Sequence, residues 1–221
     1  MVKSFSLFKI ASTISICLSQ SGVNKPSIVN HFITDSKEIA LTFDDGPDCN
    51  NTPKILSILD QYNIKATFFV LGQNAIKYPY IIKDILNKGH CIGLHTYSHP
   101  NFNHLTKSEI ENEIKLNQKV VADIINYKPT IIRPPYGIIT DDFLCICAKM
   151  GLSVFTWSKD SFDWKTKNSS YQIVRNVTED IKKGSIILMH DKSANQKNSS
   201  LALPSIIEKL TNDGFKFVTL K

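Results

Sequence analysis

From Ile39 to the end of the chain, short apolar runs alternate with segments whose apolar residues recur at helical spacing. The runs are rich in β-branched and aromatic residues and have the length of buried strands. Repeated strand–helix alternation favours a parallel sheet, either open or closed into a barrel. The expected strands are Ile39–Phe43, Ala66–Leu71, Cys91–Leu94, Ile131–Arg133, Ser153–Thr156, Ser185–Met189 and Lys216–Leu220.

The intervening segments carry helix start and stop signals. Thr52 is expected to cap the first helix, with Pro53 at its first position. Thr106 and Glu109 predict a capping box at the start of the longest helix. Three further helices, each followed by glycine, are expected over Thr140–Met150, Ser169–Lys183 and Leu203–Asp213.

Size and composition indicate one globular domain with a sizeable core. The chain has 221 residues, of which 42% are hydrophobic and 21% charged. Its net charge of +6 suits an anionic surface such as a wall polymer, a membrane or nucleic acid. Because the lysines are scattered and no arginine-rich block occurs, nucleic-acid binding is not expected.

The N-terminus has the features of a secretory signal peptide over residues 1–21. Lys3 and Lys9 precede the apolar segment Ile10–Leu18, and small residues follow before a cut near Gly22. The segment is too short to span a bilayer, and no other run is long and apolar enough, so no stable membrane span is expected. A disordered arm or an uncleaved anchor is the competing interpretation. We therefore expect a secreted or cell-wall location.

Polar residues follow the expected strands where their carboxyl ends should meet. In parallel α/β folds the reacting groups gather at that edge. Ionised carboxylates there are costly unless a cation, a metal or hydrogen-bond donors receive them. The alternative for the first pair is a turn in which aspartate caps the next helix. The residues are Asp44, Asp45, His95, Arg133, Asp160, Asp163, His190 and Asp191.

Two histidines suggest a metal site. His95 and His99 are four residues apart, so both imidazoles can reach one ion. Asp44 or Asp45 would supply a third ligand, and two histidines with one carboxylate leave the open position that is typical of catalytic sites. Zinc suits these ligands, while cobalt, nickel and iron remain possible.

Three other positions have open interpretations. The prolines after Arg133 fix the backbone and hold Arg133 and the Tyr136 amide in place, although Arg133 also suits a local structural pairing. Trp164 suits stacking on a sugar ring or closing the core. His190 ends an apolar strand and suits a third metal ligand, a general acid or a core residue.

Taken together, the motifs resemble the NodB-homology polysaccharide deacetylases of carbohydrate esterase family 4. The resemblance covers Lys37 to Leu220, and the segments Ala66–Gly72 and Gly89–Gly93 are also similar to the family framework. The five ordered motifs are Thr42–Pro47, His95–His99, Arg133–Tyr136, Asp160–Trp164 and Leu188–Asp191.

The resemblance implies a single-domain α/β fold, a distorted (β/α) barrel, over residues 37–221, preceded by an extension over 22–36. It also implies one divalent metal, Zn²⁺ or alternatively Co²⁺, bound by Asp45, His95 and His99. Asp44 would be the general base, paired with Arg133, and His190 the general acid, tuned by Asp163. The Tyr136 backbone N–H would stabilise the oxyanion, and Trp164 and Leu188 would shape the substrate pocket.

The implied reaction is hydrolytic N-deacetylation of N-acetylglucosamine units in a chitin-like polysaccharide, with release of acetate. Two alternatives stay open. The chain would instead be a non-catalytic glycan-binding protein that retains the site, or it would deacetylate peptidoglycan or acetylxylan. No oligomeric state follows from the sequence.

Overall fold

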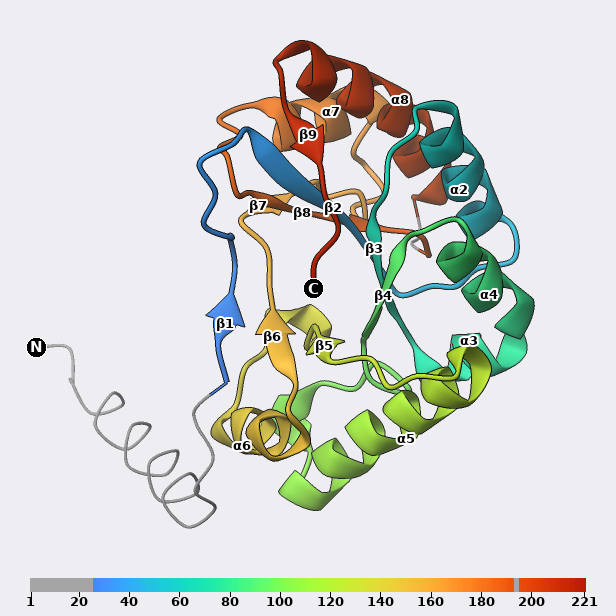
Figure 1. Ribbon diagram of the computed structural model, residues 1–221, viewed down its shortest axis with the longest axis vertical. Coiled ribbons are helices and arrows are strands. Elements are labelled where there is room, and N and C mark those ends of the chain that lie inside the picture. The colour runs from blue at the N-terminus through green and yellow to red at the C-terminus, as the bar shows by residue number, and fades with distance from the viewer. Residues whose placement is uncertain (1–25, 193–194) are drawn as a thin grey trace, which may run out of the picture.

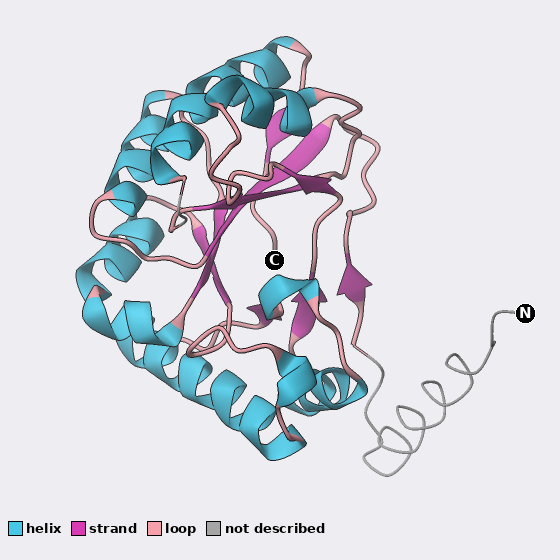
Figure 2. Ribbon diagram, turned by 180° about the vertical axis from the view of Figure 1, so that it is seen from behind, coloured by secondary structure: helices cyan, strands magenta, loops and turns pink. Residues whose placement is uncertain are grey.

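The strands form one curled parallel sheet, and the helices pack around its outer side (Figure 1). The computed structural model describes residues 26–192 and 195–221. The expected signal peptide over 1–21 lies outside the described residues. Seen from behind, the helices again border the strands in an arc (Figure 2). Because the strands pair in parallel, their carboxyl ends lie at the same edge of the sheet.

Within the described residues the sheet has the order β1-β6-β5-β4-β3-β2-β8-β7, and β9 pairs with β2. All pairings between these strands are parallel. The strands are β1 (Ile28–Val29), β2 (Glu38–Asp44), β3 (Thr67–Val70), β4 (Cys91–Leu94), β5 (Ile131–Ile132), β6 (Ser153–Phe155), β7 (Lys159–Asp160), β8 (Ile186–His190) and β9 (Lys216–Phe217).

The helices connect successive strands. They are α2 (Asn51–Gln61), α3 (Gly72–Lys77), α4 (Pro79–Asn87), α5 (Lys107–Ile125), α6 (Asp141–Met150), α7 (Ser170–Thr178) and α8 (Gln196–Asn212), with 3₁₀ turns η1 (Phe102–His104) and η2 (Pro135–Gly137).

Strand β2 lies at the centre of the core. Its residues from Ile39 to Asp44 are buried, and it pairs with both β3 and β8. The register places Asp44 opposite Phe69 on one side and opposite His190 on the other. The sheet thereby brings the polar ends of β2 and β8 together.

The expected single-domain α/β fold with a distorted barrel is confirmed. The strand path runs from β1 to β7 without closing, so the sheet forms a half-barrel. Part of the expected extension over 22–36 joins this sheet, because β1 pairs with β6. The capping box at Thr106 and Glu109 is also confirmed.

Helix boundaries differ from expectation at three places. Helix α2 begins at Asn51, and the Thr52 hydroxyl instead donates to Asp191 Oδ2 at 2.6 Å. Helix α7 ends at Thr178 because Glu179 is extended and Asp180 has a φ of 52°. Helix α8 begins at Gln196 and continues through Pro204, since the apolar face around that proline is buried in the core.

Among the helices of the described residues, none combines the length and the apolar character that a membrane crossing requires.

Candidate active site

Arg133 is fully buried directly after β5 and binds the carboxylate at the end of β2. Its Nη1 donates to Asp44 Oδ1 and to Thr42 Oγ1, both at 2.7 Å, and its Nη2 donates to the Thr156 carbonyl at 3.1 Å. A buried guanidinium is tolerated only when it is paired and hydrogen-bonded. These contacts fix Asp44 Oδ1 and leave Asp44 Oδ2 directed toward His95, 3.8 Å from its Nε2.

Asp45 faces two imidazoles instead. Its Oδ1 lies 3.5 Å from His95 Nε2 and 3.3 Å from His99 Nε2. One ligand atom from each of the three residues lies within 4.8 Å of the other two. Asp45 Oδ1 is buried and has no hydrogen-bond partner among the described residues. A buried carboxylate oxygen without a donor is costly, so this oxygen fits a bound cation.

The surroundings of the two histidines suit metal binding. His95 Nδ1 lies 2.8 Å from the Arg133 carbonyl, which leaves Nε2 directed at Asp45. Burial and the neighbouring His95 lower the pKa of His99, which favours the neutral imidazole that binds metals. Burial alone would raise the pKa of Asp45, but His95, His190 and His99 outweigh it and lower this pKa to about 2. An ionised carboxylate and two imidazoles fit a divalent metal such as zinc.

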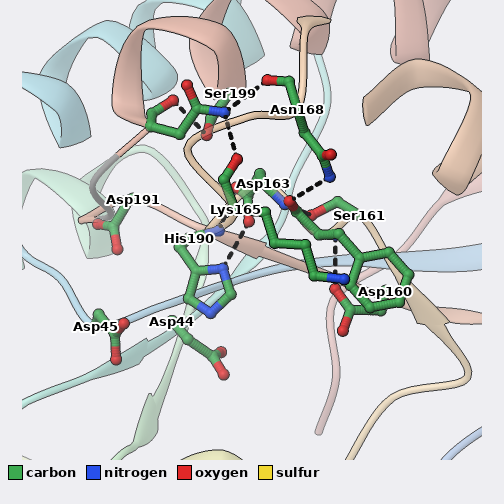
Figure 3. A network of polar contacts seen from close by, with 12 residues as sticks. Asp44, Asp45, Asp160, Ser161, Asp163, Lys165, Asn168, His190, Asp191 and Ser199 are labelled. Atoms are coloured by element: carbon green, nitrogen blue, oxygen red, sulfur yellow. Dashed lines mark hydrogen bonds and ion pairs between the residues drawn. The ribbon is translucent and has the colours of Figure 1, made fainter. Parts of the chain in front are cut away.

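His190, at the end of β8, is paired with a fully buried aspartate. Its Nδ1 donates to Asp163 Oδ1 at 2.7 Å, and its backbone N–H donates to Asp163 Oδ2 at 2.9 Å. Figure 3 shows the imidazole between Asp163 on one side and Asp44 and Asp45 on the other. Burial would lower the pKa of His190, but the bond and charge of Asp163, helped by Asp44, raise it to about 9. The imidazole is therefore protonated at neutral pH, as a general acid requires.

These groups open into one pocket of about 370 Å³. Leu188 lies in its wall at 3% exposure, whereas Tyr136 and Trp164 are 63% and 47% exposed at the surface. The Tyr136 ring also packs edge-on against His99, with 4.5 Å between the ring centroids. The pocket is lined by Asp44, Asp45, His95, His99, Tyr136, Trp157, Asp160, Trp164, Leu188 and His190.

All ten residues expected to form the site lie in or directly behind this pocket. Eight of them line it, while Arg133 and Asp163 lie behind it and contact Asp44 and His190. The structure thus brings all of the expected residues together at one site.

Three further residues of the site received no role from the sequence. Thr42 accepts from Arg133 and donates to the Ile187 carbonyl at 2.6 Å. Trp157 and Asp160 line the pocket. Asp160 was expected among the polar residues at the strand ends but received no role, and Trp157 directly follows the expected strand Ser153–Thr156, a position that could have identified it. Thr42 gave no such signal, because a threonine inside a buried strand is ordinary.

Comparison with known proteins agrees with this geometry. A family described as "Polysaccharide deacetylase" matches residues 33–155. A peptidoglycan-N-acetylglucosamine deacetylase of Bacillus cereus is 45% identical over 184 residues, which cover 83% of this chain and 66% of that protein. The relative PgdA of Listeria monocytogenes, a protein of the same description, is 37% identical over 97% of this chain and 44% of its own length.

A solved structure extends the match to the fold. The crystal structure of the Bc1960 peptidoglycan N-acetylglucosamine deacetylase superposes with a TM-score of 0.85 at 42% identity. It covers 88% of this chain and 91% of that one. This chain nevertheless spans less than two thirds of the two curated relatives. Enzymes of this family use a divalent metal, and the Asp45, His95 and His99 cluster matches that requirement. From the family match, the sequence relatives and the shared fold together, the chain belongs to the polysaccharide deacetylase family.

Proposed function

We propose that this chain is a metal-dependent deacetylase that removes the N-acetyl group from N-acetylglucosamine units of peptidoglycan. The observation that carries the proposal is the division between Asp44, held by Arg133, and Asp45, directed at two histidines. The relatives described above support peptidoglycan as the polymer better than the chitin-like polysaccharide expected from the sequence.

A divalent metal bound by Asp45, His95 and His99 would polarise the acetyl carbonyl and lower the pKa of an attacking water. Zn²⁺ is the proposed ion, with Co²⁺ as the alternative, because a carboxylate and two imidazoles suit both.

The chain's own residues then carry the proton transfers. Asp44 Oδ2 accepts the proton of the attacking water, while Arg133 holds the other carboxylate oxygen. The Tyr136 backbone N–H stabilises the oxyanion. His190, protonated through its bond to Asp163, donates from Nε2 to the departing amine. Acetate and a free glucosamine unit result.

The pocket wall positions the sugar. Trp164 presents an exposed ring on which a sugar face can stack, and the buried Leu188 side chain supplies an apolar wall for the acetyl methyl group. The basic character of the chain, with a net charge of +6, suits an anionic wall polymer.

One acetate-release experiment tests this proposal. Chelated protein is reloaded with Zn²⁺ or Co²⁺ and incubated with peptidoglycan, chitin oligomers or acetylxylan, and Asp44→Asn serves as the inactive control. We expect metal-dependent acetate release that is greatest from peptidoglycan. Greater acetate release from chitin oligomers would favour the chitin-like substrate expected from the sequence. No acetate release from any of the substrates would overturn the assignment as an enzyme.

The same materials separate the two alternatives. If the chain were a non-catalytic glycan-binding protein, the wild type and Asp44→Asn would bind glycan equally well, and neither would release acetate. An esterase acting on acetylxylan would depend less on His190, since an alkoxide leaves without protonation more readily than the anion of an amide nitrogen does. Comparing His190→Ala on an amide and an ester substrate distinguishes these reactions.

A substrate in the cell wall requires export, so we also propose that residues 1–21 direct secretion. N-terminal sequencing of the mature protein tests this, with a new terminus near Gly22 as the expected result.

A further inference from the structure

The loop that carries both histidine ligands is bonded to helix α5 by one carboxylate. Glu113 Oε2 accepts from the backbone N–H groups of Tyr97 and Ser98, at 3.0 and 2.8 Å. Glu113 Oε1 accepts from the Ser98 hydroxyl at 2.8 Å. A single side chain on α5 therefore engages both residues between Thr96 and His99.

The loop needs such support because its backbone is unfavourable. Thr96 and His99 have φ values of 67° and 65°, in the left-handed region that non-glycine residues rarely adopt. Conformations of this kind persist only where the surroundings hold them. Bonding the Tyr97 and Ser98 amides, which lie between these two residues, supplies that restraint.

A second set of contacts holds the other side of the loop. Gly72 N–H donates to the Thr96 carbonyl and Gln73 N–H to the Tyr97 carbonyl, both at 3.1 Å. Asn117, one helical turn after Glu113, also donates to the Thr96 carbonyl. The loop thus stays attached when Glu113 is changed, but its central amides lose their acceptor.

His99 depends on this loop more than His95 does. His95 directly follows β4, and its ring contacts the Arg133 carbonyl. Within the described residues the His99 ring contacts Asp45, His95 and Tyr136, and no backbone carbonyl orients it. The placement of His99 Nε2 follows from the path of the loop.

We propose that Glu113 is a positioning residue for the metal site: it fixes the loop from His95 to His99 so that both imidazoles face Asp45. The inference rests on the metal site of the proposed function. Glu113 itself lies outside the pocket lining and is not one of the three residues of the Asp45, His95 and His99 cluster.

The test measures Zn²⁺ affinity by competition with a fluorescent chelator, without any glycan present. Glu113→Ala should weaken Zn²⁺ binding about 10- to 100-fold, as loss of an outer-shell partner commonly does. Glu113→Gln keeps one carbonyl acceptor and should weaken it less. Glu111→Ala is the matched control, because Glu111 lies on the same helix and pairs only with the exposed Lys115 in the described structure. The Zn²⁺ affinity of Glu111→Ala should equal that of the wild type.

Two further measurements distinguish a positioning role of Glu113 from a general effect on protein stability. The visible absorption of the Co²⁺-loaded Glu113→Ala protein should differ from that of the wild type, and kcat at saturating Zn²⁺ should recover to within about twofold. Zn²⁺ affinity of Glu113→Ala equal to that of Glu111→Ala would overturn the inference, whatever the change in Tm. Absence of Zn²⁺ uptake by the wild type would overturn it together with the metal site. Zn²⁺ binding without acetate release would instead count against the proposed function alone.

Discussion

Asp44 and Asp45 are adjacent in the chain, but their carboxylates face different groups. Asp44 Oδ1 lies 2.7 Å from Arg133 Nη1, whereas Asp45 Oδ1 lies 3.3 Å from His99 Nε2. The chain turns between them because Asp45 has a φ of 75° directly after β2 ends. This turn directs two neighbouring carboxylates at different groups, as the proposed roles of a base and a metal ligand require.

Replacing Arg133 by methionine should destabilise the protein as well as inactivate it. The change leaves Asp44 as a buried carboxylate without its cation, and breaking a buried pair in this way costs about 3–5 kcal/mol. Urea unfolding measures the loss. Arg175→Met is the matched control, since Arg175 is exposed and pairs with Glu179 four residues on, an exposed pair that solvent screens, so its loss should cost little. Equal losses in the two variants would contradict the buried pairing.

The pH dependence of turnover should report His190. Its pKa is raised to about 9, so the acid form is present below that pH and is lost as pH rises through it. We expect kcat/KM on an amide substrate to fall on this alkaline side. Asp163→Asn removes the bond and charge that raise this pKa, so the fall should move roughly one to two pH units lower.

The control for this shift is Asp123→Asn, because Asp123 is exposed and pairs only with Lys119 in the described structure. Its pH profile should match that of the wild type. An alkaline limb that stays in place in Asp163→Asn would show that another group sets it.

Asp191 should make the protein less stable as pH rises through the weakly acidic range. Burial raises its pKa from 3.8 to about 7, although the Thr52 hydroxyl opposes the shift. Between these values the folded state binds more protons than the unfolded state, so the free energy of unfolding decreases as pH increases. The difference between these two pKa values corresponds to about 4 kcal/mol of folding free energy as an upper limit.

Unfolding of the wild type and of Asp191→Asn, compared from pH 4 to pH 8, isolates this contribution. As pH rises to about 7, the free energy of unfolding of the wild type should decrease relative to that of Asp191→Asn. Above about pH 7 the difference between the two proteins should stay constant. A constant difference over the whole range would mean that Asp191 is ionised throughout.

The sequence predicted the parallel sheet because the strands of such a sheet are buried on both faces and read as short apolar runs. It predicted the site because its residues lie at the carboxyl ends of those runs, as His190 is the last residue of β8. The parts that escaped prediction depend on contacts between distant segments. The sequence around Thr52 predicts a helix cap, yet the Thr52 hydroxyl donates to Asp191, which is 139 positions away in the chain.

Glu113 shows the same limit within the site. It lies at an ordinary position of an amphipathic helix, and its role arises only from where α5 passes the loop. The distance in sequence between Glu113 and Ser98 is 15 residues, so no local pattern links them. Contacts of this kind depend on how helices and strands pack against one another. The periodicity of apolar residues in the sequence does not encode that packing.

The most direct test of the account compares metal content and acetate release in Asp44→Asn and Asp45→Ala, both reloaded with Zn²⁺ after chelation. Asp45→Ala should lose the metal. Asp44→Asn should retain it, while turnover falls by about 10²- to 10⁴-fold, the range typical of a lost general base. Equal loss of metal from both variants, or turnover retained in Asp44→Asn, would contradict the division of roles between the two carboxylates.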